Sequence, residues 1–162
     1  GIYTAHLSGN NEGIALFSVT EVGEATQSDV YLSNISTRAM VGTGSKQLIA
    51  GFTVSGDGDP GRFLVGAAGP AMQDAGVDGV LQDPFLRLHD TQNSVIVHSN
   101  DNWQEDPTAP ELIAADKAAD YPSEPRFFQD LSSGTYTANV TGVGSTTGRA
   151  IVGVTEEVTS GE

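Results

Sequence analysis

The amino-acid sequence predicts an all-β fold: an antiparallel β-sandwich or jelly-roll-like domain with one short helical insertion and an extra N-terminal β-hairpin. Short runs of residues alternate apolar with polar side chains, as half-buried strands do, and glycine, proline, asparagine and aspartate separate these runs. Strand and helix patterns do not alternate along the chain, which argues against a parallel α/β sheet. Only one stretch, in the second half, has a convincing helical pattern.

The first half of the chain reads as strands joined by glycine turns. Residues 30–36 alternate and predict a strand. Residues 46–55 form the clearest strand pattern of this half, with one apolar face: Leu48, Ala50, Phe52 and Val54. A tight acidic turn follows at 56–61, and we expect residues 62–68 to pair back across it as the second arm of a hairpin.

The second half begins with one or two helical turns at 70–77, which glycines and a proline stop from growing. Residues 85–90 and 94–99 predict another hairpin. Residues 110–119 are expected to form the only substantial helix, because Pro110 suits a first helical position and a run of helix-forming residues follows it. A loop after this helix is expected to insert three apolar side chains into the core: Phe127, Phe128 and Leu131.

The two ends of the chain repeat one another. Residues 1–9 and 13–21 align with 134–142 and 148–156, with five identities in each nine-residue strand. Each copy reads as two alternating strands around a small-residue turn, so we expect a β-hairpin at both ends. Convergence of two unrelated hairpins on common strand residues is the alternative, but the order of the identities favours a true repeat.

The spacing of the repeat indicates a module of domain size. The two copies are offset by 133 residues in the first strand and 135 in the second, far more than a solenoid repeat. We therefore divide the chain into an N-terminal hairpin at 1–22, a linker at 23–29 and a sandwich module at 30–162.

Composition limits the partners. Seven Lys and Arg against twenty-one Asp and Glu give a net charge of −14, which disfavours nucleic acid and anionic membranes. No apolar run is long enough to insert into a membrane. The absence of cysteine excludes disulfides, thiol catalysis and cysteine-bound metal. An acidic, glycine-rich β protein fits the bacterial cell surface, and we expect that any export signal has already been removed.

Several motifs also resemble a known type of module. They lie at residues 32–38 (LSNISTR), 41–44 (VGTG), 48–52 (LIAGF), 62–70 (RFLVGAAGP), 81–90 (LQDPFLRLHD) and 99–103 (SNDNW). Together they resemble the β module that is repeated in tandem in many large secreted bacterial surface proteins, over about residues 30–158. That module also ends in a Tyr-Thr-Ala strand and a Gly-x-x-x-Val-x-Val-x-Glu strand. The resemblance implies an extracellular, non-catalytic building block.

Candidate metal ligands surround the hairpin predicted at 85–99. Asp90, Asn100 and Asp101 carry the oxygen atoms that Ca²⁺ prefers, although no EF-hand spacing is present. Asn and Asp also make turns by bonding to their own backbone, and that explanation is favoured. We therefore expect no obligatory cofactor, with Ca²⁺ as the alternative.

Other candidate residues have an ordinary structural explanation. His89 and His98 flank one hairpin loop and could supply half a metal site, but exposed strand positions explain them as well. Trp103 is either core or a platform for stacking a sugar, and core is favoured. Asn34 and Asn139 match the N-glycosylation acceptor pattern, which often arises by chance. No Ser/His/Asp constellation is evident, so we do not expect an enzyme.

The N-terminal copy of the repeat suggests the function. Residues 134–158 already supply this hairpin to their own module, yet one face of the first copy is too apolar to remain in water. We expect that face to be a subunit interface: Tyr3, Ala5, Leu7, Ala15, Phe17 and Val19. The sequence thus predicts an extracellular structural subunit that polymerises head to tail into a filament or surface array by strand complementation. The alternative is a carbohydrate- or surface-binding accessory module of a larger secreted protein.

Overall fold

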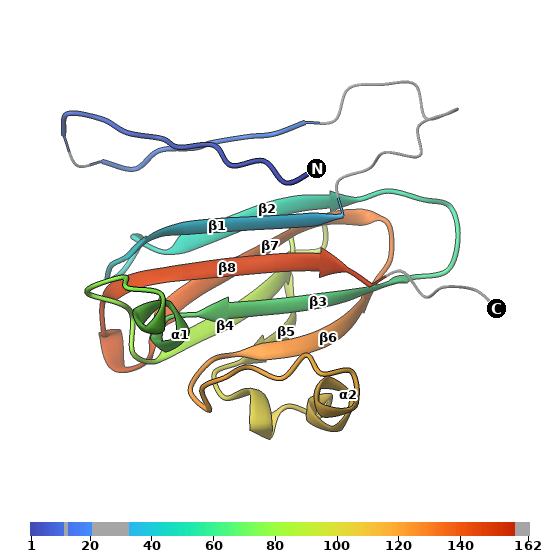
Figure 1. The fold of residues 1–162 in the computed structure, drawn as a ribbon. Helices are drawn as coiled ribbons and strands as arrows, with labels where there is room; N and C mark the ends of the chain where they lie inside the picture. Colours follow the sequence, from blue (N-terminus) through green and yellow to red (C-terminus); the bar gives the residue numbers. More distant parts are fainter. Residues whose placement is uncertain (12, 21–32, 158–162) are drawn as a thin grey trace. The chain divides into compact units, whose positions relative to one another are not determined.

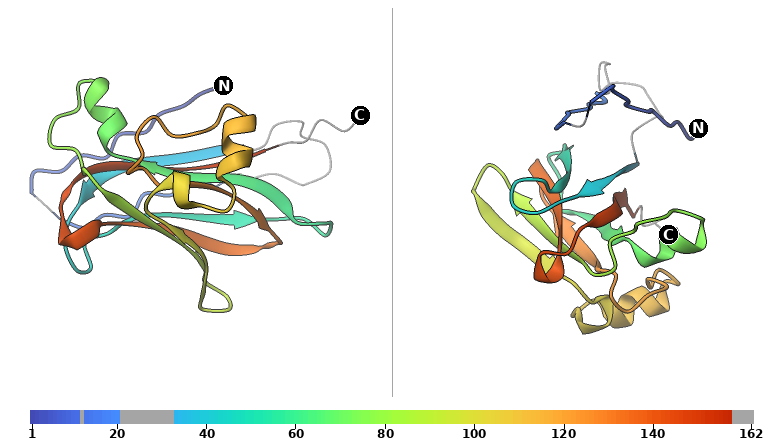
Figure 2. Two further views of the ribbon diagram at one scale, coloured as in Figure 1. Left: turned by 90° about the horizontal axis from the view of Figure 1, so that it is seen from below. Right: turned by 90° about the vertical axis from the view of Figure 1, so that its left-hand side faces the viewer.

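The computed structural model of the chain describes residues 1–11, 13–20 and 33–157. Residues 33–157 form a β-sandwich of two four-stranded antiparallel sheets, which confirms the predicted all-β class. The two sheets lie face to face as layers (Figures 1 and 2). The first sheet has the strand order β1 (Asn34–Val41), β8 (Gly148–Glu156), β3 (Gly61–Ala68) and β6 (Arg126–Leu131). The second sheet has the order β2 (Leu48–Val54), β7 (Gly134–Gly142), β4 (Pro84–Asp90) and β5 (Val95–Asn100).

The predicted hairpin at 134–156 is wrong. β7 and β8 do not pair with each other: β7 lies between β2 and β4 in the second sheet, whereas β8 lies between β1 and β3 in the first. The one-turn 3₁₀ helix η2 (Val143–Ser145) lies in the connection that leads from β7 in one sheet to β8 in the other. The two strands therefore form an arch, in which consecutive strands face each other through the core instead of sharing hydrogen bonds.

The hairpin predicted across the acidic turn at 56–61 is also wrong. β2 pairs with β7, and β3 pairs with β6 and β8, so these consecutive strands also belong to opposite sheets. Alternation reveals which face of a strand is buried but not which strand it pairs with, and that is why both hairpin predictions failed. β4 and β5 do pair antiparallel, which confirms the hairpin predicted at 85–99.

The helices are short. α1 (Pro70–Asp74) lies within the helical turns predicted at 70–77. α2 (Ala109–Ala114) begins one residue before the predicted helix and ends five residues earlier. Asp116 has a positive φ of 55°, which an α-helix cannot contain, so the chain leaves the helix here despite its helix-forming composition. The one-turn 3₁₀ helix η1 (Trp103–Glu105) precedes α2.

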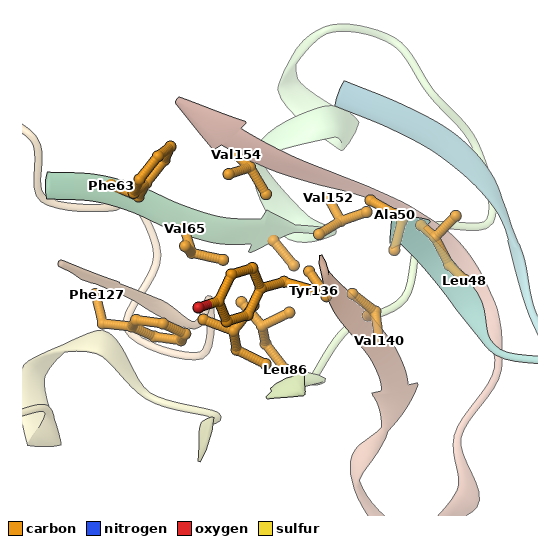
Figure 3. Close-up of a cluster of buried hydrophobic side chains, with 14 of the residues drawn as sticks. Leu48, Ala50, Phe63, Val65, Leu86, Phe127, Tyr136, Val140, Val152 and Val154 are labelled. Carbon is orange, nitrogen blue, oxygen red and sulfur yellow. The ribbon is translucent and has the colours of Figure 1, made fainter. Parts of the chain in front are cut away.

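Two hydrophobic clusters hold the sandwich together. The larger cluster fills the space between the two sheets, and Figure 3 shows Tyr136, Val140, Val152 and Val154 within it. The smaller cluster contains Trp103, Ala109, Leu112, Ala119 and Phe128. Burial of Trp103 confirms the core interpretation of this residue.

Strand β6 connects the two clusters. Phe127 and Phe128 are consecutive and therefore point to opposite faces of the strand, one into each cluster. Leu131, at the end of β6, joins Phe127 in the larger cluster. These three side chains are buried as expected, but they lie on a strand and not on the loop that the sequence predicted.

The N-terminal segment is a unit separate from the sandwich. No strand is assigned within 1–11 or 13–20, so the predicted hairpin is not formed in this part of the segment. An isolated pair of strands is marginal in water without a sheet to pack on, which accounts for the difference. The remaining residues of the predicted hairpin, the linker at 23–29 and the start of the strand predicted at 30–36 lie outside the described residues.

Candidate assembly segment and other candidate sites

The sandwich shows what the repeated sequence does when it is folded. The six residues predicted as the interface align with six positions of β7 and β8. All six of those positions are at most 5% exposed and belong to the larger cluster: Tyr136, Ala138, Val140, Ala150, Val152 and Val154. The face predicted as the subunit interface in the first copy is therefore equivalent to the face that the second copy buries.

In the first copy the same side chains are exposed. Identical residues differ most clearly: Tyr3 is 93% exposed and Tyr136 is 5% exposed, while Val19 is 59% exposed and Val154 is 4% exposed. Every described residue of 1–11 and 13–20 is exposed. The segment thus carries a core-like face with no core of its own.

The opposite face of the segment is apolar as well, which the sequence reasoning missed. Ile2, Ile14 and Leu16 are 85% exposed or more. Ile2 aligns with Thr135 and Ile14 with Arg149, so the first copy is more apolar on this face than the second. The sequence already contained a sign of this second apolar face, because each of these three residues is next to a residue of the predicted interface face.

The structure does not bring the candidate Ca²⁺ ligands together. Asp90 ends β4, and its carboxylate accepts hydrogen bonds from the backbone N–H groups of Gln92 and Asn93 at 2.9 and 3.0 Å. These bonds, together with one from the Asn93 side chain, hold the pKa of Asp90 below its usual value; the side-chain bond has the largest effect. Asp90 therefore makes the turn, as the favoured explanation required.

Asn100 lies at the other end of the same hairpin, opposite Leu86, four residues before Asp90 in β4. Four residues of strand span about 13 Å, too far for one ion to bridge. Its amide donates to the carbonyl of Asn102 at 2.9 Å and accepts from the backbone N–H of Arg126 at 3.2 Å. Among the described residues, no three His, Cys, Asp or Glu side chains form a group that could hold a metal ion.

Asp101, the third candidate, acts on a different carboxylate. The pKa of Asp83 is raised, first by partial burial and then by the nearby negative charge of Asp101. Two carboxylates without further ligands do not define a cation site.

His89 and His98 do not face each other. A register shift between Leu88 and His89 places His98 opposite Leu88, while His89 lies opposite Ile96. His98 stacks on Phe127 with ring centroids 3.9 Å apart, so it belongs to the edge of the core. His6 lies in the exposed N-terminal segment.

His98 is part of a polar network that the sequence did not predict. Its Nδ1 lies 2.9 Å from Oε1 of Gln129, and its Nε2 lies 2.7 Å from Oδ2 of Asp106. Asp106 is only 5% exposed and also accepts bonds from the backbone N–H and the hydroxyl of Thr108. The Thr108 hydroxyl in turn accepts from the backbone N–H of Phe128. The network ties β5, β6 and the helical insertion together, which gives it a structural role.

A second buried carboxylate, Glu124, fixes the start of α1. Its Oε1 accepts hydrogen bonds from the backbone N–H groups of Gly69 and Ala71 at 3.0 and 2.8 Å. Burial raises the pKa of Glu124 above its ordinary value, although these two bonds and the charge of Arg126 act in the opposite direction. Glu124 is 1% exposed, so no substrate reaches it from the surface.

The two candidate glycosylation sites differ. Asn34 is exposed at the start of β1 and donates to the hydroxyl of Thr155 at 2.7 Å. Asn139 is half-buried in the middle of β7, a strand with neighbours on both sides. A bulky glycan suits a surface loop, so Asn139 is a poor acceptor.

The two best-formed hollows on the described surface are smaller than a typical ligand site. Two surface hollows hold about 200 and 250 Å³, below the roughly 300–1,000 Å³ of typical small-molecule pockets. None of the helices in the described part is long and apolar enough to cross a membrane. No protein-family model matches the chain, and the searches of curated proteins and of solved structures found no match either.

Proposed function

We propose that the chain is a structural subunit that assembles with copies of itself, head to tail, by donating residues 1–22 to a neighbouring sandwich. The observation that carries the proposal is the difference between the two copies of the repeat. The same face, with identical residues at several positions, is buried in β7 and β8 and exposed in the N-terminal segment.

Burial of the segment's apolar side chains in a neighbouring sandwich is energetically favourable. Each large apolar side chain that moves from water into a core contributes about 1.5–3 kcal/mol. Leu7, Phe17 and Val19 are each more than half exposed in this structure, and Tyr3 is almost fully exposed. A neighbouring sandwich can offer both main-chain hydrogen bonds and apolar pockets to such a segment.

The symmetry of this contact determines the product. The donated segment and the accepting sandwich are different surfaces, so the contact is heterologous, and a heterologous contact that does not close generates an open fibre. The resemblance of residues 30–158 to modules of secreted bacterial surface proteins supports a place at the cell surface or outside the cell.

Removal of residues 1–22 tests the proposal. We expect the shortened chain to keep the far-ultraviolet circular dichroism of a β-sandwich and to elute as a monomer with light scattering. The full chain should form polymers under the same conditions. Equal assembly by both chains would exclude the mechanism.

A matched pair of substitutions controls for charge. Leu7→Asp places a carboxylate on the proposed interface face, and Ser8→Asp adds the same charge to the neighbouring position on the other face. We expect Leu7→Asp to abolish polymers and Ser8→Asp to retain them. Equal loss in both variants would point to charge repulsion instead of a specific face.

A further inference from the structure

We infer that the donated segment docks on the side of the neighbouring sandwich where β1 and β2 are the edge strands, and that it extends both sheets at once. Residues 13–20 add to β1 and continue the first sheet, while residues 1–9 add to β2 and continue the second. The inference rests on the proposed self-assembly and specifies which surface accepts the segment.

The β1/β2 side of the sandwich leaves core-facing side chains half covered. Four hydrophobic residues pack against the larger cluster while remaining partly exposed, and three of them, Ile35, Phe52 and Val54, lie on β1 and β2. At the opposite side, the bond between His98 of β5 and Gln129 of β6 joins the two sheets. The β1/β2 side therefore carries more half-covered core-facing side chains than the β5/β6 side.

The edge strands of the two sheets differ in how well they are protected against pairing with another strand. Natural edge strands usually carry charges, prolines or bulges that discourage pairing with another strand. β2 has no charged residue and no proline, and it pairs with β7 without a register shift. On the other side, the β4–β5 pairing contains a register shift, and β6 carries Arg126 and Asp130, whereas β1 carries one charged residue, Arg38. β2 is thus the edge best suited to accept a strand.

The repeat supplies the register of the docked segment. In the second sheet, Tyr136, Ala138 and Val140 of β7 lie opposite Phe52, Ala50 and Leu48 of β2. In the first sheet, Ala150, Val152 and Val154 of β8 lie opposite Ala39, Thr37 and Ile35 of β1. β1 and β2 form an arch between the sheets, as β7 and β8 do. A second arch with the same sequence pattern fits the free edges in the same direction and register.

This register places the proposed interface residues over the half-covered ones. Tyr3 lies opposite Phe52, and Val19 lies opposite Ile35, each as its repeat partner does on the other edge. All six residues of the face then point into the space between the sheets. The donated segment covers these side chains of the neighbour's core.

Disulfide trapping tests this docking, because the chain contains no cysteine of its own. Ser18 aligns with Gly153, which lies opposite Ser36 of β1, so the inference places Ser18 of one copy opposite Ser36 of the next. Directly opposed residues in an antiparallel pair have Cα atoms about 4.5–5.5 Å apart, within disulfide range. The test variant is Ser18→Cys with Ser36→Cys. The control variant is Ser18→Cys with Ser99→Cys, since Ser99 is an exposed residue of β5 on the other side of the sandwich.

Both variants are assembled in reductant, checked for polymers by light scattering, oxidised and separated on a non-reducing denaturing gel. We expect a ladder of covalent multimers from the Ser18/Ser36 variant. We expect no ladder from the Ser18/Ser99 control. Polymers in reductant without a ladder would overturn the docking while leaving self-assembly in place. Absence of polymers, or a cross-link within a single chain, would overturn the proposed function as well.

Discussion

Val154 and Val19 are the same residue at equivalent positions of the repeat, and the same substitution should act on different properties at each. Val154 is 4% exposed in the core of the sandwich. Val154→Ala removes two methyl groups, worth about 1.6 kcal/mol of transfer free energy at about 0.8 kcal/mol each, and leaves a cavity. We expect the free energy of unfolding to fall by about 2–3 kcal/mol.

Val19→Ala should leave the stability of the sandwich unchanged, within about 0.5 kcal/mol, because residue 19 lies outside that unit. If the neighbour buries Val19 as the core buries Val154, the substitution should weaken the subunit contact by about 1–2 kcal/mol, or roughly 5- to 30-fold in the dissociation constant.

The two effects are separated by two assays on the same proteins. Urea unfolding, carried out at a concentration where the chain is monomeric, measures stability, and sedimentation over a concentration series measures assembly. The reasoning is refuted if Val19→Ala destabilises the sandwich as much as Val154→Ala does, or if Val19→Ala assembles like the unaltered chain.

Three further outcomes are expected. Gly69→Ala would place a Cβ atom 1.8 Å from the carbonyl oxygen of Leu81. Thermal unfolding should therefore show that the free energy of unfolding falls by about 3 kcal/mol. Unchanged stability would contradict the tight packing at this position. His98→Ala should cost about 2–3 kcal/mol in urea unfolding, because it removes the stacked ring and one partner of buried Asp106; a cost below about 0.5 kcal/mol would contradict it. Glu124 has a raised pKa in the folded state, so native protein holds this proton to higher pH than unfolded protein, and stability falls as pH rises from about 4.5 through the folded pKa. Glu124→Gln should remove that fall, and parallel pH–stability curves for the two proteins would count against the burial effect.

Alternation along the sequence predicts faces well, because burial of one side of a strand requires it. Leu48, Ala50, Phe52 and Val54 were placed on one face of 46–55, and all four contact the larger cluster. The repeat worked in the same way, since it transferred the pattern of β7 and β8 to the N-terminal segment.

Strand partners could not be predicted in this way. A short turn of small residues serves a hairpin within one sheet and an arch between two sheets equally well, so the pairs β2–β3 and β7–β8 were assigned to hairpins. The β4–β5 hairpin was correct because its turn has specific chemistry, with Asp90 accepting the N–H groups of the two turn residues that follow Thr91.

The polar sites show the same limit. Asp90 and Asn100 were grouped although they lie near opposite ends of one predicted hairpin, and the register confirms this separation. The network around His98 was missed because Gln129 is 31 residues away and is brought close only by the packing of β5 against β6. Contacts that depend on sheet packing leave no local mark in the sequence.

The most direct test of the central claim is the mass distribution of the full chain across a concentration series, measured by sedimentation velocity or mass photometry. Non-closing donation of residues 1–22 predicts a series of masses in steps of one 16.8 kDa subunit, whose average grows with concentration. A single species of 16.8 kDa at all concentrations, or one closed oligomer of fixed size, would contradict the account.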